Sequence, residues 1–269
     1  MIAINGTIKT GPGPIARIRT HQPPSRSAMK KLIKGLRQFQ SQYFSSHQDL
    51  FEQLAHGQKP QVLFIACSDS RVDPNLIVQA EPGEIFVLRN AGNIVPPYGA
   101  ANGGEGATIE YAIAALGVSD VIVCGHSHCG AMKGLFKLKE LSESMPLVCH
   151  WLNHAEATRR VVLDNYTACS KDELAEIAVA ENVLTQIDNL RTYPIVRSRL
   201  NQGLLRLHAW VYEFETGEVY AYDPIKQEYV SPERTWNQPT PAFRLPHQVA
   251  TACDWLPEDQ ADRIYRGSH

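Results

Sequence analysis

Two short runs of the sequence combine residue types that can bind a metal ion and orient a reacting water. The first run, residues 67–71, reads CSDSR, and the second, residues 125–130, reads GHSHCG. Cys67, His126 and Cys129 offer two thiolates and one imidazole, a soft ligand set that suits zinc. They leave a fourth tetrahedral position without an obvious cysteine or histidine, and an open position is typical of catalytic zinc sites.

Two neighbouring residues compete for the metal in this interpretation. Cys124 lies within an apolar run that we expect to be a strand, and His128 is two residues from His126 and need not face the same way. Spacing alone leaves the ligand set open, because a single cysteine is usually a small buried apolar residue. A second hypothesis for His128 is proton transfer, since a neutral imidazole titrates near physiological pH.

The flanking residues predict the elements that position these runs. Residues 61–66, 84–89 and 121–125 are short apolar runs typical of strands buried in a parallel sheet. Between the second and third runs, the spacing of apolar residues over 109–116 predicts a helix that Gly117 can end. Strands and helices therefore alternate, which indicates an α/β fold. Both metal-binding runs would follow strands, at the carboxyl edge where open α/β sheets place their sites.

The outer segments complete the predicted organisation. Apolar residues at helical spacing from Met29 onward predict an N-terminal amphipathic helix. Residues 170–194 predict a long helix that starts at a capping box and is closed by Pro194, and residues 204–223 predict a hairpin at one edge of the sheet. Proline recurs after residue 225, so we expect an extended tail there. The predicted parts are a disordered leader (1–28), a main domain that carries the site (29–224) and a C-terminal extension (225–269).

Composition excludes several classes of protein. The chain has 269 residues, 43% of them apolar and 20% charged, with a net charge of -2, which is typical of globular proteins and provides no basic field for nucleic acid. No apolar run approaches the ~20 residues of a membrane span. Six cysteines are too sparse for a disulfide scaffold, so we expect a reducing, intracellular compartment. Residues 1–48 contain eight Lys or Arg and no acid, a pattern shared by transit peptides and disordered leaders.

Four separated blocks carry a family resemblance. They read CSDSRV, RNAGNIVPPYG, GATIEYAIAALGV and GHSHCGAMKGL, and in this order they resemble the β-class carbonic anhydrases from about Lys31 to Asp223. The resemblance implies a mainly parallel β-sheet flanked by helices, homo-oligomers built from dimers, and reversible hydration of carbon dioxide to bicarbonate. It also implies that Zn²⁺ is held by Cys67, His126 and Cys129.

The resemblance assigns further residues. It implies that Asp69 orients a zinc-bound hydroxide and that Arg71 grips Asp69, without which Asp69 could itself become the fourth zinc ligand of a closed site. The substrate pocket implied by the resemblance is formed by Gln58, Phe86, Ala91, Tyr111 and Gly130. Gln58 would act across the dimer interface. Ala91 departs from the valine common in plant relatives, which predicts a roomier pocket wall.

The outer segments narrow the resemblance to one branch. Residues 99–106 (GAANGGEG), the extension and the terminal LPEDQADRIYRGSH resemble carboxysomal β-carbonic anhydrases of cyanobacteria. This implies a cytoplasmic enzyme inside the carboxysome that supplies carbon dioxide to Rubisco and is attached through its extension to a carboxysome scaffold protein. Two alternatives remain: a related hydrolase of carbon disulfide or carbonyl sulfide, and a zinc-stabilised scaffold component without activity.

Overall fold

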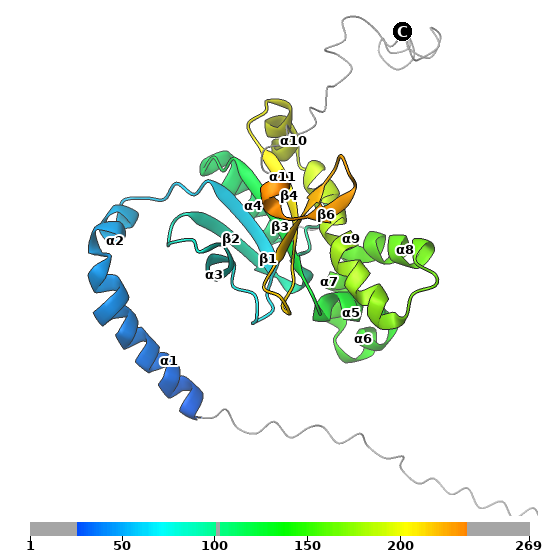
Figure 1. The fold of residues 1–269 in the computed structure, drawn as a ribbon, viewed down its shortest axis with the longest axis horizontal. Coiled ribbons are helices and arrows are strands. Elements are labelled where there is room, and N and C mark those ends of the chain that lie inside the picture. The colour runs from blue at the N-terminus through cyan, green and yellow to red at the C-terminus, as the bar shows by residue number, and fades with distance from the viewer. Residues whose placement is uncertain (1–25, 101–102, 236–269) are drawn as a thin grey trace, which may run out of the picture. The chain divides into compact units, whose positions relative to one another are not determined.

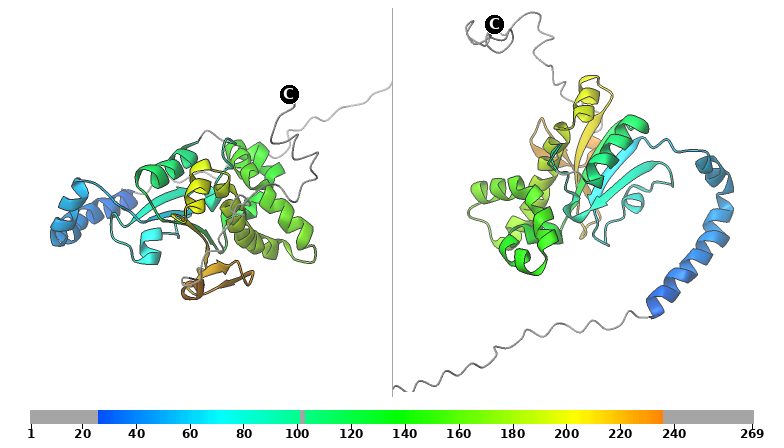
Figure 2. Two further views of the ribbon diagram at one scale, coloured as in Figure 1. Left: turned by 90° about the horizontal axis from the view of Figure 1, so that it is seen from above. Right: turned by 180° about the vertical axis from the view of Figure 1, so that it is seen from behind.

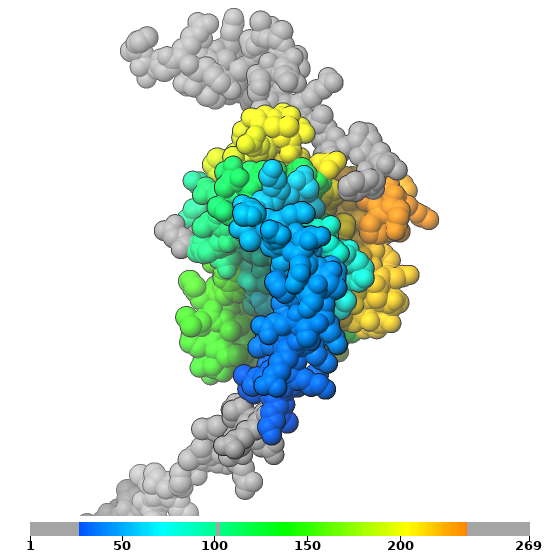
Figure 3. Space-filling view, turned by 90° about the vertical axis from the view of Figure 1, so that its left-hand side faces the viewer, coloured from blue at the N-terminus to red at the C-terminus, as the bar shows by residue number. Residues whose placement is uncertain are grey.

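The computed structural model describes residues 26–100 and 103–235, which belong to two compact units. The first unit contains α1 (Arg26–Gln38), the π-helical segment η1 (Phe39–Phe44) and α2 (Gln48–Ala55), drawn in blue in Figure 3. The predicted N-terminal helix is therefore present, and it already includes Arg26, three residues before the predicted start at Met29. Its apolar row is solvent-exposed, since Leu32 and Leu36 are 61% and 66% exposed.

The second unit begins at Gln58 and is built on a six-stranded sheet with the order β2-β1-β3-β4-β5-β6 (Figure 1). Four strands are parallel and the last two are antiparallel, which confirms the predicted mainly parallel α/β class. The strands are β1 (Val62–Cys67), β2 (Ile85–Asn90), β3 (Asp120–His126), β4 (Arg206–Tyr212), β5 (Val219–Asp223) and β6 (Glu228–Val230).

Helices cover the two faces of this sheet unequally (Figure 2). Leu63 and Val123 face a core shared with α4, α9 and α10, whereas Phe64 and Ile122 face a smaller apolar cluster on the other side. The helices of this unit are α3 (Pro74–Val78), η2 (Ala91–Asn93), α4 (Gly104–Glu110), η3 (Tyr111–Ala115), α5 (Gly130–Leu135), α6 (Leu138–Ser144), α7 (Pro146–Leu152), η4 (Asn153–Ala155), α8 (Glu156–Asn165), α9 (Lys171–Arg191), α10 (Pro194–Asn201) and α11 (Pro232–Thr235).

Local sequence signals explain how α9 reaches the end of β3. The predicted capping box is confirmed: the Ser170 hydroxyl accepts a hydrogen bond from the Glu173 amide, and the Glu173 carboxylate accepts one from the Ser170 amide. Gly125 lets the helix pack closely against the strand, because a Cβ there would lie only 2.8 Å from a methyl of Val183. The close packing places α9 directly beside the segment that follows β3.

The C-terminal part of the sheet differs from the predicted extended tail. Residues 228–230 form β6, which pairs with β5, so the sheet continues past residue 224. The remainder of the predicted extension, residues 236–269, and the predicted leader, residues 1–25, lie outside the described residues. No helix within residues 26–100 and 103–235 combines the length and apolar character that a bilayer crossing needs.

Candidate zinc site

Cys67, His126 and Cys129 converge at the carboxyl edge of the sheet. Cys67 and His126 are the last residues of the adjacent parallel strands β1 and β3, and Cys129 is the residue that precedes α5. The sequence predicted that each of Cys67 and His126 directly follows its strand. In the structure each of them is instead the last residue of its strand. The candidate ligand atoms of the three residues all lie within 4.8 Å of one another. All three residues are buried, with 6%, 1% and 2% exposure.

The imidazole of His126 is oriented as a metal ligand would be. Its Nδ1 lies 2.9 Å from the carbonyl oxygen of Ser127, which favours the tautomer with hydrogen on Nδ1. Its Nε2 is buried and has no hydrogen-bond partner among the described residues. Buried nitrogens are rarely left unpaired, and a nitrogen that faces two thiols fits metal binding. The three residues therefore fit a zinc ion.

Hydrogen bonds prepare one of the two thiols as a thiolate. The Cys129 thiol donates to Cys67 and, despite burial, lowers the pKa of Cys67 to about 4; the amide of Gly92 also donates to its Sγ at 3.3 Å. The same contact with Cys67 raises the pKa of Cys129. Cys67 is thus the thiol of the pair that ionises first, and a thiolate is the form that binds metal. Gly92 has φ of +80°, and a Cβ there would lie 2.9 Å from that of Ala131.

A carboxylate held by an arginine borders this group. Arg71 donates from Nε and one terminal nitrogen to the two oxygens of Asp69, at 2.9 and 2.8 Å. This bidentate contact is the main reason that the pKa of Asp69 lies well below its usual range. Oδ2 of Asp69 is 4.0 Å from Nε2 of His126, so the carboxylate reaches the ligand group without belonging to it.

Two kinds of supporting residue were missed by the sequence analysis. Arg89 donates to the carbonyls of Cys67 and Asp69, at 3.0 and 2.7 Å, and fixes the backbone of the first run. Asn182 and Gln186, both buried in α9, bond to the loop that follows β2: Asn182 donates to the Gly92 carbonyl, and Gln186 accepts from the Val95 amide. Polar residues four apart in an otherwise apolar helix face were the only available signal.

The predicted pocket residues lie at both ends of the strands: Ala91 directly follows β2 and Gly130 begins α5, whereas Phe86 is near the start of β2. The rings of Phe86 and Tyr111 contact each other, with centroids 6.1 Å apart. The carbonyl of Ala91 accepts a hydrogen bond from the indole of Trp151, at 2.8 Å. Gly130 is the first residue of α5 and has open space at its Cβ position. Gln58 is exposed. The substrate-binding roles of these residues remain predictions.

The two rival ligands lie outside the metal-binding group. Cys124 is fully buried within β3, where desolvation raises the pKa of its thiol to about 12. His128 has a left-handed backbone, with φ of +55°, and its ring pairs with Glu176 and Glu215 rather than with the thiols. The structure thus places His126, and not His128, beside the two thiols. Residue spacing alone did not decide between the two histidines.

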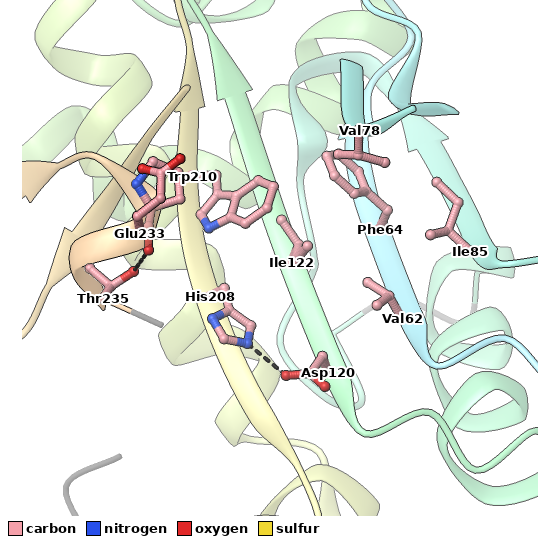
Figure 4. Close-up of a pocket in the computed structure, with 11 residues that line it drawn as sticks. Val62, Phe64, Val78, Ile85, Asp120, Ile122, His208, Trp210, Glu233 and Thr235 are labelled. Atoms are coloured by element: carbon pink, nitrogen blue, oxygen red, sulfur yellow. Dashed lines mark hydrogen bonds and ion pairs between the residues drawn. The ribbon is translucent and has the colours of Figure 1, made fainter. Parts of the chain in front are cut away.

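A second concave feature lies away from this chemistry. A cavity of about 510 Å³ lies on the face of the sheet opposite α9 and α10, and it is lined by apolar side chains of β1 to β4, among them Phe64, Ile122 and Trp210 (Figure 4). At its polar edge, His208 bonds to Asp120 at 2.8 Å. None of the three candidate zinc ligands lines the cavity.

The fold and the ligand group define an α/β protein with a group that could hold a metal ion where its parallel strands end. The family model described as carbonic anhydrase matches residues 62–219, and the chain belongs to the β-carbonic anhydrase family. It is 69% identical to a carbonic anhydrase of Synechococcus elongatus, over 89% of this chain and 99% of that protein. It is 54% identical to a carbonic anhydrase of Synechocystis sp., over 89% of this chain and 100% of that protein.

Solved structures agree with this family. The chain is similar to the structure of the β-carbonic anhydrase CcaA, with a TM-score of 0.76 and 64% identity over 77% of this chain and 92% of that one. It also resembles one of two tetrameric β-carbonic anhydrases of Sordaria macrospora, with a TM-score of 0.65 and 28% identity over 73% of this chain and 97% of that one. The predicted resemblance to β-carbonic anhydrases is confirmed.

Proposed function

We propose that the protein catalyses the reversible hydration of carbon dioxide to bicarbonate with Zn²⁺ held by Cys67, His126 and Cys129. The observation that carries the proposal is the buried ligand group with the Arg71-held carboxylate of Asp69 at its border. Membership of the carbonic anhydrase family supports the same reaction. The intact Asp69 and Arg71 pair weighs against a scaffold component without activity.

Different residues of the chain have different roles in this reaction. Bound zinc would supply hydroxide near neutral pH, because it lowers the pKa of water from 15.7 to about 7. Asp69 stays ionised because Arg71 lowers its pKa. Its carboxylate can therefore accept a hydrogen bond from the hydroxide that attacks carbon dioxide. That bond turns a lone pair of the oxygen toward carbon dioxide. Cys67, His126 and Cys129 are buried, so the interactions between charges at this site are only weakly screened by solvent.

The test is stopped-flow hydration of carbon dioxide by purified protein, combined with metal analysis. We expect about one zinc per chain and activity that disappears with the zinc. Measurements under reducing and oxidising conditions would show whether the free thiols affect the rate. Headspace assays with carbon disulfide and carbonyl sulfide separate the alternative hydrolase, because the same nucleophile could attack either gas. Zinc-replete protein without carbon dioxide hydration would refute the proposal.

We propose in addition that the chain works inside a carboxysome, attached through the part of the C-terminal extension that follows β6. The support is the identity of 54% and 69% to cyanobacterial carbonic anhydrases over nearly their whole length. Truncation after Pro257 should leave hydration intact in purified protein and reduce co-sedimentation with carboxysomes in cells. Loss of hydration with unchanged co-sedimentation would instead place the tail in the catalytic fold.

We propose that the chain forms homo-oligomers built from dimers, in which the apolar row of α1 covers the open sheet face of a second copy. Two exposed apolar surfaces of the same chain support this: the α1 row that includes Leu32 and Leu36, and the cavity lined by Phe64 and Trp210. Basic residues flank the row, among them Lys30, Lys31 and Arg37, whereas Asp120 and Glu233 line the cavity. A similar solved structure is tetrameric.

Sedimentation velocity tests this proposal. Leu32→Gln combined with Leu36→Gln removes apolar side chains from the row and should shift the protein to smaller species at micromolar concentration. Lys34→Gln changes a residue on the other side of the same helix and should leave the distribution unchanged. If the double variant sediments like the wild type, α1 does not form the interface.

A further inference from the structure

Phe214 lies between the ligand group and the residue that grips Asp69. It is the first residue of the turn between β4 and β5. The centroid of its ring is 5.2 Å from that of His126. The guanidinium carbon of Arg71 lies 4.3 Å from the same ring centroid. One aromatic side chain thus touches both a candidate zinc ligand and the arginine that holds the neighbouring carboxylate.

The backbone of Phe214 is tied to the segment between His126 and Cys129. The Phe214 amide donates to the hydroxyl of Ser127 at 3.0 Å, and the Ser127 amide donates to the carbonyl of Tyr212 at 2.9 Å. The ring of Tyr212 also packs edge-on against Phe214, with centroids 5.3 Å apart. These contacts hold the turn that contains Phe214 in a fixed position relative to His126. The Phe214 ring is therefore kept against the guanidinium of Arg71.

Arg71 needs such support because it is otherwise at the surface. Its side chain is 51% exposed, whereas that of Asp69 is 18% exposed. Exposed ion pairs contribute little by themselves, since ordering a long side chain costs entropy. Among the described residues, the other contacts of the guanidinium are a long hydrogen bond to the His128 carbonyl, at 3.4 Å, and the face of Phe214. An aromatic face attracts a guanidinium and favours one orientation of its plane.

We propose that Phe214 is a positioning residue that acts through Arg71. Its ring holds the guanidinium in the plane that engages both oxygens of Asp69, and so keeps the carboxylate beside the ligand group, 4.0 Å from Nε2 of His126. Without the ring, Arg71 releases Asp69, which can then turn toward the metal position. This role rests on the proposed hydration of carbon dioxide, in which Asp69 orients the nucleophile.

The experiment compares Phe214→Leu with Phe214→Tyr, which keeps the ring. We expect kcat for carbon dioxide hydration to fall about 10-fold in the leucine variant, the size of loss typical of outer-shell residues, with KM nearly unchanged. The tyrosine variant should stay within about twofold of the wild type. Phe136→Leu, at the end of α5, is the control for losing a partly buried ring and should also stay near the wild type.

Two further measurements separate positioning from simple packing. The visible absorption spectrum of cobalt(II)-substituted protein should change in Phe214→Leu and not in Phe136→Leu, because Asp69 then approaches the metal. In an Arg71→Ala background, Phe214→Leu should cause no further loss, since residues that act through one another are not additive. Phe214→Met gives the same comparison should the leucine variant fail to fold.

The outcomes distinguish this inference from the proposed function. The proposed function is wrong if wild-type protein binds zinc but does not hydrate carbon dioxide. In that case the cobalt spectra still show whether Phe214 controls the position of Asp69. Active wild type with an unchanged kcat in Phe214→Leu overturns the inference. An equal loss in the wild-type and Arg71→Ala backgrounds overturns it as well, because Phe214 would then act independently of the arginine.

Discussion

The side-chain amide of Asn182 donates a hydrogen bond to the carbonyl oxygen of Gly92 at 3.0 Å, across 90 positions of the chain. Gly92 uses its own amide to donate to the sulfur of Cys67. The amide oxygen of Asn182 accepts in turn from Gln186 at 2.8 Å and from Thr158 at 3.3 Å. Helix α9 therefore supports a candidate zinc ligand through one intervening residue, and buried networks of this kind are costly to break.

Replacement of Asn182 by leucine tests this support. The variant keeps a similar volume but leaves the Gly92 carbonyl and the Gln186 amide without a buried partner, which should lower the free energy of unfolding by about 3 kcal/mol. We expect zinc affinity to fall about 10-fold, because the amide of Gly92 loses its alignment with Cys67. Urea unfolding measures the first effect, and competition with a chelator measures the second.

Asn165→Leu is the matched control. Asn165 is exposed at the end of α8, and within the described residues its side chain bonds only to the Val161 carbonyl of the same helix. The control should change neither zinc affinity nor stability by more than about 0.5 kcal/mol. A destabilised Asn182→Leu protein with wild-type zinc affinity would show that α9 packs against the loop without positioning Cys67.

The ligand strands were predictable from sequence because their signals are local. Apolar runs that end at Cys67 and near His126 place both residues at one edge of a parallel sheet. The residues that support the site were not predictable, since Asn182 bonds to Gly92, which lies 90 positions away in the sequence. Phe214 extends an apolar strand pattern, yet it lies in the turn. Strand β6 has only three residues, which is too short to show an alternating pattern.

Loss of a ligand should remove the metal and the activity together. We expect Cys67→Ala and His126→Ala to retain less than about a tenth of the wild-type zinc, because a structural or catalytic zinc needs its full protein ligand set. Metal analysis after gel filtration and stopped-flow hydration measure the two effects. Cys124→Ala removes a buried thiol outside the ligand group and should keep its zinc. Zinc-free variants with full activity would end the ligand assignment.

Asp69→Asn should separate metal binding from turnover. The amide cannot accept hydrogen bonds as the carboxylate does, so we expect zinc to remain and kcat to fall about 100-fold, within the range of acid–base and orienting groups. Stopped-flow kinetics and metal analysis of the same sample check both statements. Asp188→Asn serves as the control, because Asp188 is exposed on α9 and, in the part of the chain that the structure describes, forms an ion pair only with Arg191. Full turnover in Asp69→Asn would contradict the orienting role.

A second carboxylate network lies at the opposite edge of the sheet, where β3 and β4 begin. Asp120 accepts hydrogen bonds at 2.7 Å from two nitrogens of Arg206, one at 2.8 Å from His208 and one at 2.7 Å from the Ser119 hydroxyl. Burial by itself would raise the pKa of Asp120, but the bonds from His208, Arg206 and Ser119 outweigh burial and hold the pKa well below its usual range.

The lowered pKa of Asp120 predicts how stability depends on pH. A carboxyl group whose folded-state pKa lies below its unfolded value of about 3.9 contributes fully above that value, and the contribution is lost as pH falls through the folded pKa. Asp120→Asn should therefore lower the free energy of unfolding by about 2 kcal/mol at pH 7, as expected for hydrogen bonds to a charged group. The difference from the wild type should stay constant down to about pH 5 and shrink below about pH 4. Urea unfolding from pH 7 to pH 3 measures it, with Asp188→Asn as the exposed control. A difference that widens in acid, or is absent at pH 7, would show that the Asp120 network does not stabilise the pairing of β3 with β4.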